Sequence, residues 1–451
     1  MSAVVAGGRE TPPGPKGNWL TGSLSAFRRD RLHYLTECAR TYGDVAAFRL
    51  GSRKMMLVNH PDLIEEVLVT NNRQYIKHFA LRMTEKTLGN GLLTSEGDFW
   101  RRQRRLAQPA FHRERIAGHA EVMVAFTERM LRGWRSGQVG DIQDAMMRLT
   151  LEIIAKALFD ADVSGESAKA SAAMETVLRS FTARVGRVVR LPDFIPTPSN
   201  IRLSRAVKRL DAIIFEIIAR RRASGEDRGD LLSMLLTAQD EDDGDRMTDR
   251  QLRDEAMTLF MAGHETTANT LTWAWYLLAQ HPEVEARLHA ELDQVLGDRP
   301  PTVADLPALR FTEHVITEAL RLYPTVWILG REAIEPTEVG GYPVPVGMTV
   351  YMSQWVVHRD PRFFDDPLSY RPERWQDGLA RRIPRYAYFP FGGGPRICIG
   401  NSFAMMEAVL LLATIARRFR LELTAGTKVK LMPTMTLRAD GGISMRAIAR
   451  R

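Results

Sequence analysis

The chain has 451 residues, of which 45% are hydrophobic and 26% are charged, and its formal net charge is +8. These proportions are ordinary for a soluble globular protein, and no fixed-period repeat, low-complexity block or long Gly/Ser linker divides the chain. The excess of basic residues is not accompanied by a recognisable nucleic-acid-binding module, so we expect no nucleic-acid partner. A chain of this length could form two or three domains, but without a linker we predict one domain over residues 1–451.

The N-terminal segment, residues 1–10, has no long apolar run, which predicts neither a signal peptide nor a membrane anchor. The next amphipathic stretch, Leu32–Tyr42, contains Cys38, one of only two cysteines in the chain. Cysteine often behaves as a small apolar residue, so we expect Cys38 to pack in the core.

A cluster of basic residues begins at Trp100-Arg101-Arg102-Gln103-Arg104. On a helix the i, i+4 spacing places Trp100 and Arg104 on one face. A positive surface of this kind would steer an acidic protein toward it, and the alternative is ordinary solvated charge. The residues concerned are Arg101, Arg102, Arg104, Arg105, Arg113 and Arg115, with Arg381, Arg382 and Arg385 later in the chain.

A long, mostly apolar helix is predicted over Leu252–Gln280, ended by His281-Pro282. In its middle stands Ala262-Gly263-His264-Glu265-Thr266-Thr267, which is poor helix material because Gly and β-branched residues lower helix propensity. We expect a helix weakened at its centre, where a ligand approaches the backbone. The alternative is a glycine that permits close packing. His264 is expected on the far side of this helix.

Two later segments pair opposite charges. Glu318 and Arg321 are spaced i, i+3 on a predicted helix face. Taken alone, such a pair is usually a surface salt bridge that contributes less than about 1 kcal/mol. The segment Tyr370–Trp375 contains a further Pro-Glu-Arg triplet that ends at Arg374.

The second cysteine, Cys398, stands in the glycine-rich segment Phe391–Gly400, just before an apolar run, residues 401–417, that predicts a helix. A helix N-terminus favours thiolate over thiol. No second cysteine lies nearby to complete a zinc or iron–sulfur site, whereas a single thiolate suits haem iron. The alternative for a lone cysteine is a structural role in the core.

The segment Phe391–Gly400 resembles the Phe-x-x-Gly-x-Arg-x-Cys-x-Gly ligand loop of the cytochrome P-450 superfamily at all five fixed positions. The hexapeptide 262–267 resembles the Ala-Gly-x-Asp/Glu-Thr-Thr motif of that family. Its Glu-x-x-Arg, Pro-Glu-Arg-aromatic and Trp-x-x-x-Arg motifs are matched in the same chain order. The one mild departure is Trp375, which stands where Phe is common.

The resemblance implies a mainly α fold: one triangular domain with a small β region, and haem b buried between the long central helix and the cysteine loop. Cys398 would be the iron ligand, Thr266 would hydrogen-bond dioxygen, and Glu265 would help deliver protons. The residues implied to hold the haem and its propionates are Trp100, Arg104, Arg331, Phe391, Arg396, Cys398 and Gly400, and the implied structural triad is Glu318, Arg321 and Arg374.

The implied activity is insertion of one oxygen atom from dioxygen into a lipophilic substrate, for which a fatty-acid or terpenoid type is favoured. No flavin or iron–sulfur module is present, so electrons would come from a separate acidic ferredoxin or flavodoxin with its reductase. With Cys398 on iron no disulfide remains, which fits a cytoplasmic protein, expected as a monomer. The residues expected over the distal haem face are Leu93, Phe260, Ala262, Val326, Ile328 and Met435.

Two other functions remain open from the sequence. A peroxygenase or isomerase of the same fold would commonly lack the acid–Thr pair. A non-catalytic haem protein that senses a gas would need the thiolate but not that pair. Glu265 and Thr266 therefore favour the monooxygenase.

Overall fold

A computed structural model describes residues 11–160, 173, 176–177, 180, 195–239, 244 and 246–450. Within it the chain forms two compact units. Unit 1 consists of Met1–Phe79 and Thr317–Cys398, and unit 2 consists of Ala80–Ile316 and Ile399–Arg451. The helices α4 (Phe79–Arg82) and α15 (Arg310–Leu322) run across the divisions between these segments.

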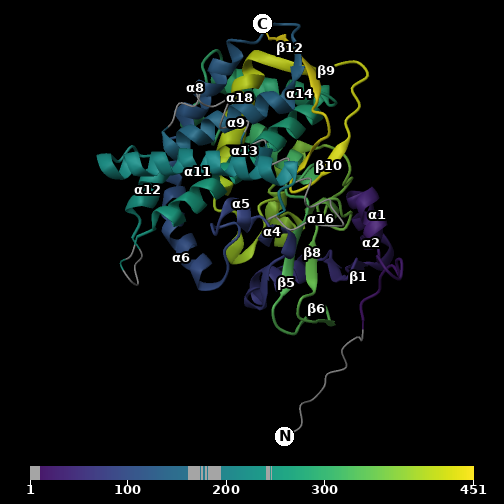
Figure 1. The fold of residues 1–451 in the computed structure, drawn as a ribbon. Coiled ribbons are helices and arrows are strands. Elements are labelled where there is room, and N and C mark those ends of the chain that lie inside the picture. Colours follow the sequence, from purple (N-terminus) through teal and green to yellow (C-terminus); the bar gives the residue numbers. More distant parts are fainter. Residues whose placement is uncertain are drawn as a thin grey trace. The chain divides into compact units, whose positions relative to one another are not determined.

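Unit 1 is built on a five-stranded sheet with the order β1-β2-β8-β5-β3 (Figure 1). The hairpin β1–β2 is antiparallel, and β2 pairs in parallel with β8. Residues 55–58 of β2 are all buried, as expected for a strand covered on both faces. The strands are β1 (Val45–Leu50), β2 (Arg53–Val58), β3 (Tyr75–Lys77), β5 (Leu329–Ala333) and β8 (Thr349–Met352), with a separate hairpin β6 (Thr337–Val339) and β7 (Tyr342–Val344).

Short helices accompany this sheet, and Asp30 caps the longest of them by accepting a hydrogen bond from the backbone amide of His33. Cys38 lies in that helix and is 3% exposed, so the predicted packing role is confirmed. The helices are α1 (Leu24–Arg29), α2 (Arg31–Tyr42), α3 (Pro61–Glu65), α16 (Gln354–Val357) and α17 (Leu379–Arg382).

Unit 2 is mainly helical and centres on α13 (Asp249–Leu278), which lies against α9 (Ile142–Phe159) (Figure 1). A capping box formed by Thr248 and Gln251 starts α13. The predicted long helix is therefore confirmed, with bounds that differ by two or three residues. The other helices are α5 (Glu85–Leu88), α6 (Gly97–Ala107), α7 (Arg113–Ala117), α8 (Ala120–Leu131), α11 (Pro198–Ser224), α12 (Leu231–Thr237), α14 (Pro282–Leu296) and α18 (Asn401–Arg418).

The predicted weakening of this helix at its centre is not observed, because α13 runs unbroken through residues 262–267. A Cβ atom at Gly263 would lie 2.8 Å from Cδ1 of Ile154 on α9. The glycine therefore permits close packing of the two helices, which was the alternative interpretation, and that packing offsets its low helix propensity.

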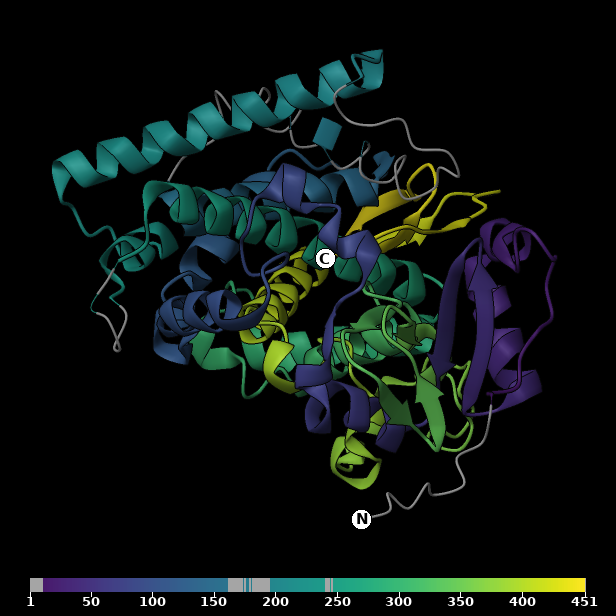
Figure 2. The same cartoon turned by 60° about the horizontal axis from the view of Figure 1, so that its bottom comes forward.

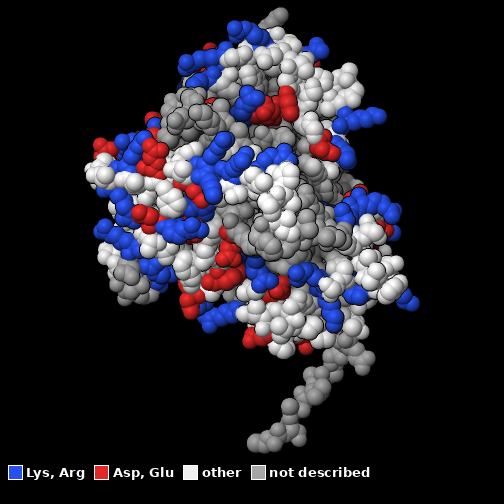
Figure 3. All heavy atoms as spheres, viewed as in Figure 1, with Lys and Arg blue, Asp and Glu red and all other residues white. Residues whose placement is uncertain are grey.

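The helix α11 is seen along its whole length in Figure 2 and packs against α13. Basic side chains gather over it in Figure 3. Its acidic side chains are Asp211 and Glu216, against seven basic ones: Arg202, Arg205, Lys208, Arg209, Arg220, Arg221 and Arg222.

Two small antiparallel sheets complete unit 2, and they confirm the predicted small β content beside a mainly helical fold. One has the order β4-β12-β9 and the other pairs β10 with β11. No helix among the described residues is long and apolar enough to cross a membrane. The strands are β4 (Val139–Asp141), β9 (Phe419–Leu423), β10 (Leu431–Pro433), β11 (Leu437–Ala439) and β12 (Ser444–Ala449).

Candidate haem-thiolate site

The segment that carries Cys398 is a closed loop. The amide of Cys398 donates a 3.0 Å hydrogen bond to the carbonyl of Phe391, and the Gly394 amide donates one of 3.2 Å to Oη of Tyr386. Gly394 has a φ of +64°, and a Cβ there would collide with the carbonyl of Leu68. Only glycine fits both the left-handed conformation and this close approach. The loop is thereby fixed by its own backbone, by the Tyr386 hydroxyl and by its close approach to Leu68.

The two cysteines differ in their surroundings. Cys398 is exposed, whereas Cys38 is buried, and neither forms a disulfide. Burial raises the pKa of the Cys38 thiol, and a hydrogen bond with Tyr34 only partly opposes this rise. A buried thiol with a raised pKa is a poor metal ligand, because binding requires the thiolate. Of the two, Cys398 is the one that can reach an iron.

One strip of the surface of α13 is open at the centre of the helix, and it is formed by the exposed Ala262 and the half-buried Thr266. Ala262 is the single exposed residue between Leu252 and Leu278, a stretch that the structure describes completely. Thr266 lies one turn further along the same face, and its hydroxyl donates a 2.8 Å hydrogen bond to the carbonyl of Ala262. An exposed alanine in an otherwise buried helix leaves room for a flat apolar group beside a hydroxyl.

The carboxyl group of Glu265 is buried beside this strip. Oγ1 of Thr436 donates a 2.7 Å hydrogen bond to Oε1 of Glu265, and Nη1 of Arg438 lies 3.9 Å from the same oxygen. Burial raises the pKa of Glu265, while Thr436 and Arg438 lower it by a smaller amount. Glu265 can therefore hold a proton at a higher pH than an exposed carboxyl could.

Two further buried groups flank these residues. The side chain of His264 is buried, and burial lowers its pKa to about 4. Its carbonyl accepts a 3.0 Å hydrogen bond from Thr150 of α9. Glu407 of α18 is fully buried, and burial raises its pKa to about 8, an effect that Thr267 only partly offsets. We did not predict Glu407, although it is the one charged residue in the apolar run 401–416.

The three members of the predicted structural triad lie together in unit 1. Arg321 donates two hydrogen bonds to Glu318, of 2.9 and 2.8 Å, and Nε of Arg374 donates one of 2.8 Å. Nε1 of Trp375 donates another of 2.8 Å. Glu318 and Arg321 are 0% exposed, so these charges are compensated inside the protein.

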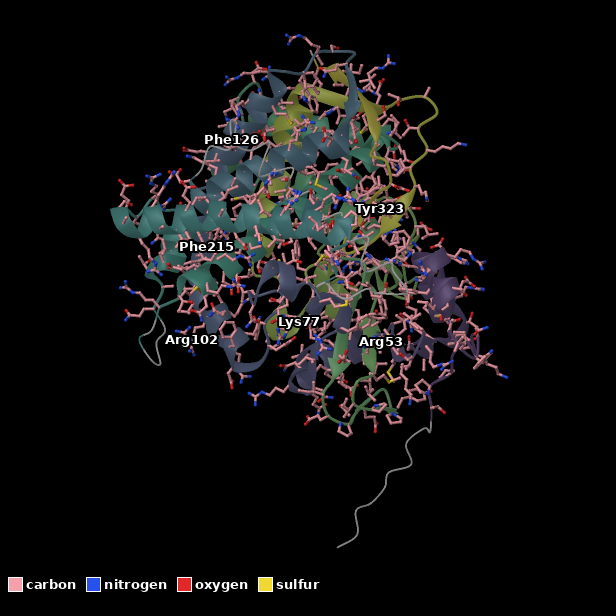
Figure 4. The ribbon with its side chains drawn as sticks, in the orientation of Figure 1. Arg53, Lys77, Arg102, Phe126, Phe215 and Tyr323 are labelled. Atoms are coloured by element: carbon pink, nitrogen blue, oxygen red, sulfur yellow. The ribbon has the colours of Figure 1, made fainter. Side chains whose placement is uncertain are left out.

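The residues predicted to hold the propionates come from separate elements. Trp100 is buried and Arg104 half-buried on α6, from which Arg102 also projects (Figure 4). Arg331 is half-buried on β5, and Arg396 is half-buried in the 3₁₀ turn Gly394–Arg396. The helix α18 begins three residues after Cys398, with Gly400 as its N-cap, close to the predicted start.

The predicted substrate residues are also spread over several elements. Phe260 is buried on α13, and its ring lies 6.1 Å from that of Phe159. It therefore packs in the core more than it faces an open surface. Ala262 is exposed on the same helix. The half-buried members are Leu93, Val326, Ile328 and Met435.

One group of residues in α13 was missed by sequence reasoning. Arg253, Asp254 and Glu255 are consecutive charged residues, and all three are buried. Charge in a helix is usually solvated, so the local pattern gave no sign of burial. A signal that could have found it is the Gly89-Asn90-Gly91 segment, because two glycines one residue apart permit a backbone to approach a helix closely.

Comparison with known proteins identifies the class. The family model of cytochrome P-450 matches residues 12–445. Cyclooctatin synthase of Streptomyces melanosporofaciens is 42% identical over 428 residues, which cover 94% of this chain and 93% of the relative. Cyclooctat-9-en-7-ol 5-monooxygenase of the same organism is 39% identical, covering 90% and 89%. Pentalenene oxygenase of Streptomyces avermitilis is 35% identical, covering 96% of both.

The chain therefore belongs to the cytochrome P-450 family, and it is a haem-dependent monooxygenase that uses dioxygen, a lipophilic substrate and a redox partner. Proteins of this family bind haem b through a cysteine thiolate. Cys398 fits the role of that thiolate ligand, because it is exposed on a closed loop. Both the predicted family and the predicted cofactor are confirmed.

Proposed function

We propose that Cys398 is the iron ligand of this monooxygenase. On the opposite face of the haem, Thr266 would hydrogen-bond dioxygen and Glu265 would help deliver protons. When bound, haem supplies the iron on which dioxygen is activated. The observation that supports Cys398 as the ligand is the contrast between the exposed Cys398 and the buried Cys38, whose thiol pKa is raised by burial. Burial also raises the pKa of the Glu265 carboxyl group, which favours its protonated form.

The roles of the polar residues follow from their surroundings. Burial raises the pKa of the Glu265 carboxyl group and so favours its protonated form, and Thr436 and Arg438 stabilise the carboxylate once a proton has left. The Thr266 hydroxyl donates to the carbonyl of Ala262 and can instead turn toward dioxygen. Trp100, Arg104, Arg331 and Arg396 would hold the propionates, for which guanidinium groups are well suited.

For the substrate we propose a cyclic terpenoid hydrocarbon or alcohol rather than a fatty acid. Three relatives that cover about nine-tenths of the chain or more have names that describe acting on or making cyclooctatin, cyclooctat-9-en-7-ol and pentalenene. Apolar residues at the predicted substrate positions, including Leu93, Val326 and Ile328, are compatible with C–H-rich groups.

For its setting we propose a cytoplasmic monomer in which both units form one haem domain. The electron donor would be a separate acidic ferredoxin or flavodoxin with its reductase. Arg101 and Arg105 of α6 and Arg381 and Arg382 of α17 are exposed and supply the positive charge that would attract such a donor.

The test is binding and turnover with matched panels of cyclic terpenoids and fatty acids, using purified holoenzyme with a bacterial ferredoxin and its reductase. We expect a spin-state shift with a terpenoid and a product that carries one added oxygen atom. Turnover of fatty acids without terpenoid binding would contradict the substrate proposal. Product formation that persists without dioxygen would contradict the proposed chemistry.

A further inference from the structure

The side chain of Arg253 joins three parts of unit 2. It is 2% exposed on α13, and its Nε donates a 2.7 Å hydrogen bond to Oδ1 of Asp211 on α11. Its Nη1 donates a 3.0 Å bond to the carbonyl of Leu88, and its Nη2 one of 3.3 Å to the carbonyl of Thr87. One buried guanidinium thus connects α11, α13 and the segment that begins at Thr87.

The two acids that follow Arg253 hold the same segment by its backbone. Asp254 accepts a 2.9 Å hydrogen bond from the amide of Asn90, and Glu255 accepts one of 3.0 Å from the amide of Leu92. Nη1 of Arg253 also lies 2.9 Å from Asp254. Buried charges are costly unless they are paired and hydrogen-bonded, so these contacts are expected to persist together.

The segment lies directly on α13. Gly89 has a φ of +79°, and a Cβ there would collide with the carboxyl group of Asp254. A Cβ at Gly91 would collide with the hydroxyl of Thr258. Thr258 is one turn before Ala262 on the same helix face. The next residues of the segment, Leu92 and Leu93, therefore lie close to the turn of α13 that precedes Ala262.

We propose that Asp211 is a positioning residue for substrate binding. Through Arg253 it couples α11 to residues 87–93, so that the place of Leu93 depends on where α11 lies. The substrate role of Leu93 rests on the proposed function. The coupling itself rests on the hydrogen bonds of Arg253, Asp254 and Glu255.

A matched control is present on the same two helices. Asp249 of α13 accepts a 2.6 Å hydrogen bond from Nε of Arg222 on α11, and both side chains are partly exposed. This second pair also joins α11 to α13, but among the described residues its hydrogen bonds and ion pairs do not reach residues 87–93. Comparing Asp211→Ala with Asp249→Ala therefore separates loss of the network from loss of an α11–α13 ion pair. Asp211→Asn serves as a milder variant if Asp211→Ala fails to fold.

The first readout is hydrogen exchange of backbone amides in the holoenzyme, measured on peptides that contain Asn90 and Leu92. We expect faster exchange there in Asp211→Ala and unchanged exchange in Asp249→Ala. Equal exchange in the two variants would overturn the coupling, whatever the substrate is.

The second readout uses two nitrogen ligands whose binding does not depend on the terpenoid assignment. Imidazole is small, whereas 4-phenylimidazole extends beyond the iron. We expect Asp211→Ala to weaken 4-phenylimidazole about three- to tenfold while leaving imidazole unchanged. Faster exchange without this selective weakening would overturn the role in ligand positioning. Failure of terpenoids to bind the wild type would contradict only the proposed substrate class.

Discussion

The backbone amide of Cys398 donates its 3.0 Å hydrogen bond to the carbonyl of Phe391, which closes the loop between these two residues. Gly394 adopts a left-handed conformation inside that loop and approaches the backbone of Leu68. The sulfur is thus carried on a segment whose shape is set by the backbone and glycine. Such preorganisation suits a ligand that must present a thiolate in one orientation.

The buried triad predicts a large loss of stability when its acid is removed. In Glu318→Ala the guanidinium of Arg321, itself 0% exposed, loses its carboxylate partner. We expect the free energy of unfolding to fall by about 3–5 kcal/mol, measured by urea denaturation of the holoenzyme. The control is Glu373→Gln, which removes the partly exposed partner of Arg371 and should cost less than about 1 kcal/mol. Similar losses in both variants would argue against a buried network.

Glu407 predicts a dependence of stability on pH. Burial raises the pKa of Glu407 from 4.5 to about 8. Between these values the folded protein keeps a proton that the unfolded chain releases, so stability is full below 4.5 and falls as the pH rises toward 8. The contribution of this one group is at most about 1.4 kcal/mol per pH unit.

The measurement is the free energy of unfolding across that range for the wild type and for Glu407→Gln. We expect the variant to lose part of the decline because its side chain stays neutral. Glu121→Gln, at an exposed position of α8, should retain the decline of the wild type. An unchanged decline in Glu407→Gln would show that Glu407 is ionised in the folded protein.

From the position of the Thr266 hydroxyl we predict that it couples electron consumption to product formation. In Thr266→Ala we expect haem to be retained while product per electron pair falls by about tenfold or more, with the difference appearing as peroxide. The control is Thr270→Ala, one turn along α13, where a similar hydroxyl donates a 2.9 Å bond to the carbonyl of Thr266. Unchanged coupling in Thr266→Ala, or equal loss in both, would remove its assigned role.

Much of the fold and of the candidate site could be predicted from local sequence. The bounds of the long helix were predicted within three residues. The predicted grouping of Glu318, Arg321 and Arg374, which came from two sequence motifs, is seen in their hydrogen bonds. Other features depend on contacts between distant residues. Glu265 is held by Thr436, 171 positions away, and Arg253 reaches Leu88, 165 positions away. No local pattern carries such information.

The weakened helix centre was predicted wrongly for a related reason. Helix propensity counts Gly263 as a cost, but the contact that requires it comes from Ile154 on α9. Tertiary packing therefore turned an unfavourable residue into a required one. Burial of Glu407 and of the charged residues 253–255 likewise follows from packing. Of these residues, only Glu407 carries a signal in the local sequence, because it is the one charged residue in an apolar run.

The most direct test of the central claim is the reduced, carbon-monoxide-bound difference spectrum of three purified proteins. The wild type and Cys38→Ser should both show the strongly red-shifted Soret band of thiolate ligation. Cys398→Ser should lose that band. Retention of the band in Cys398→Ser, or its loss in Cys38→Ser, would contradict the assignment of Cys398 as the iron ligand.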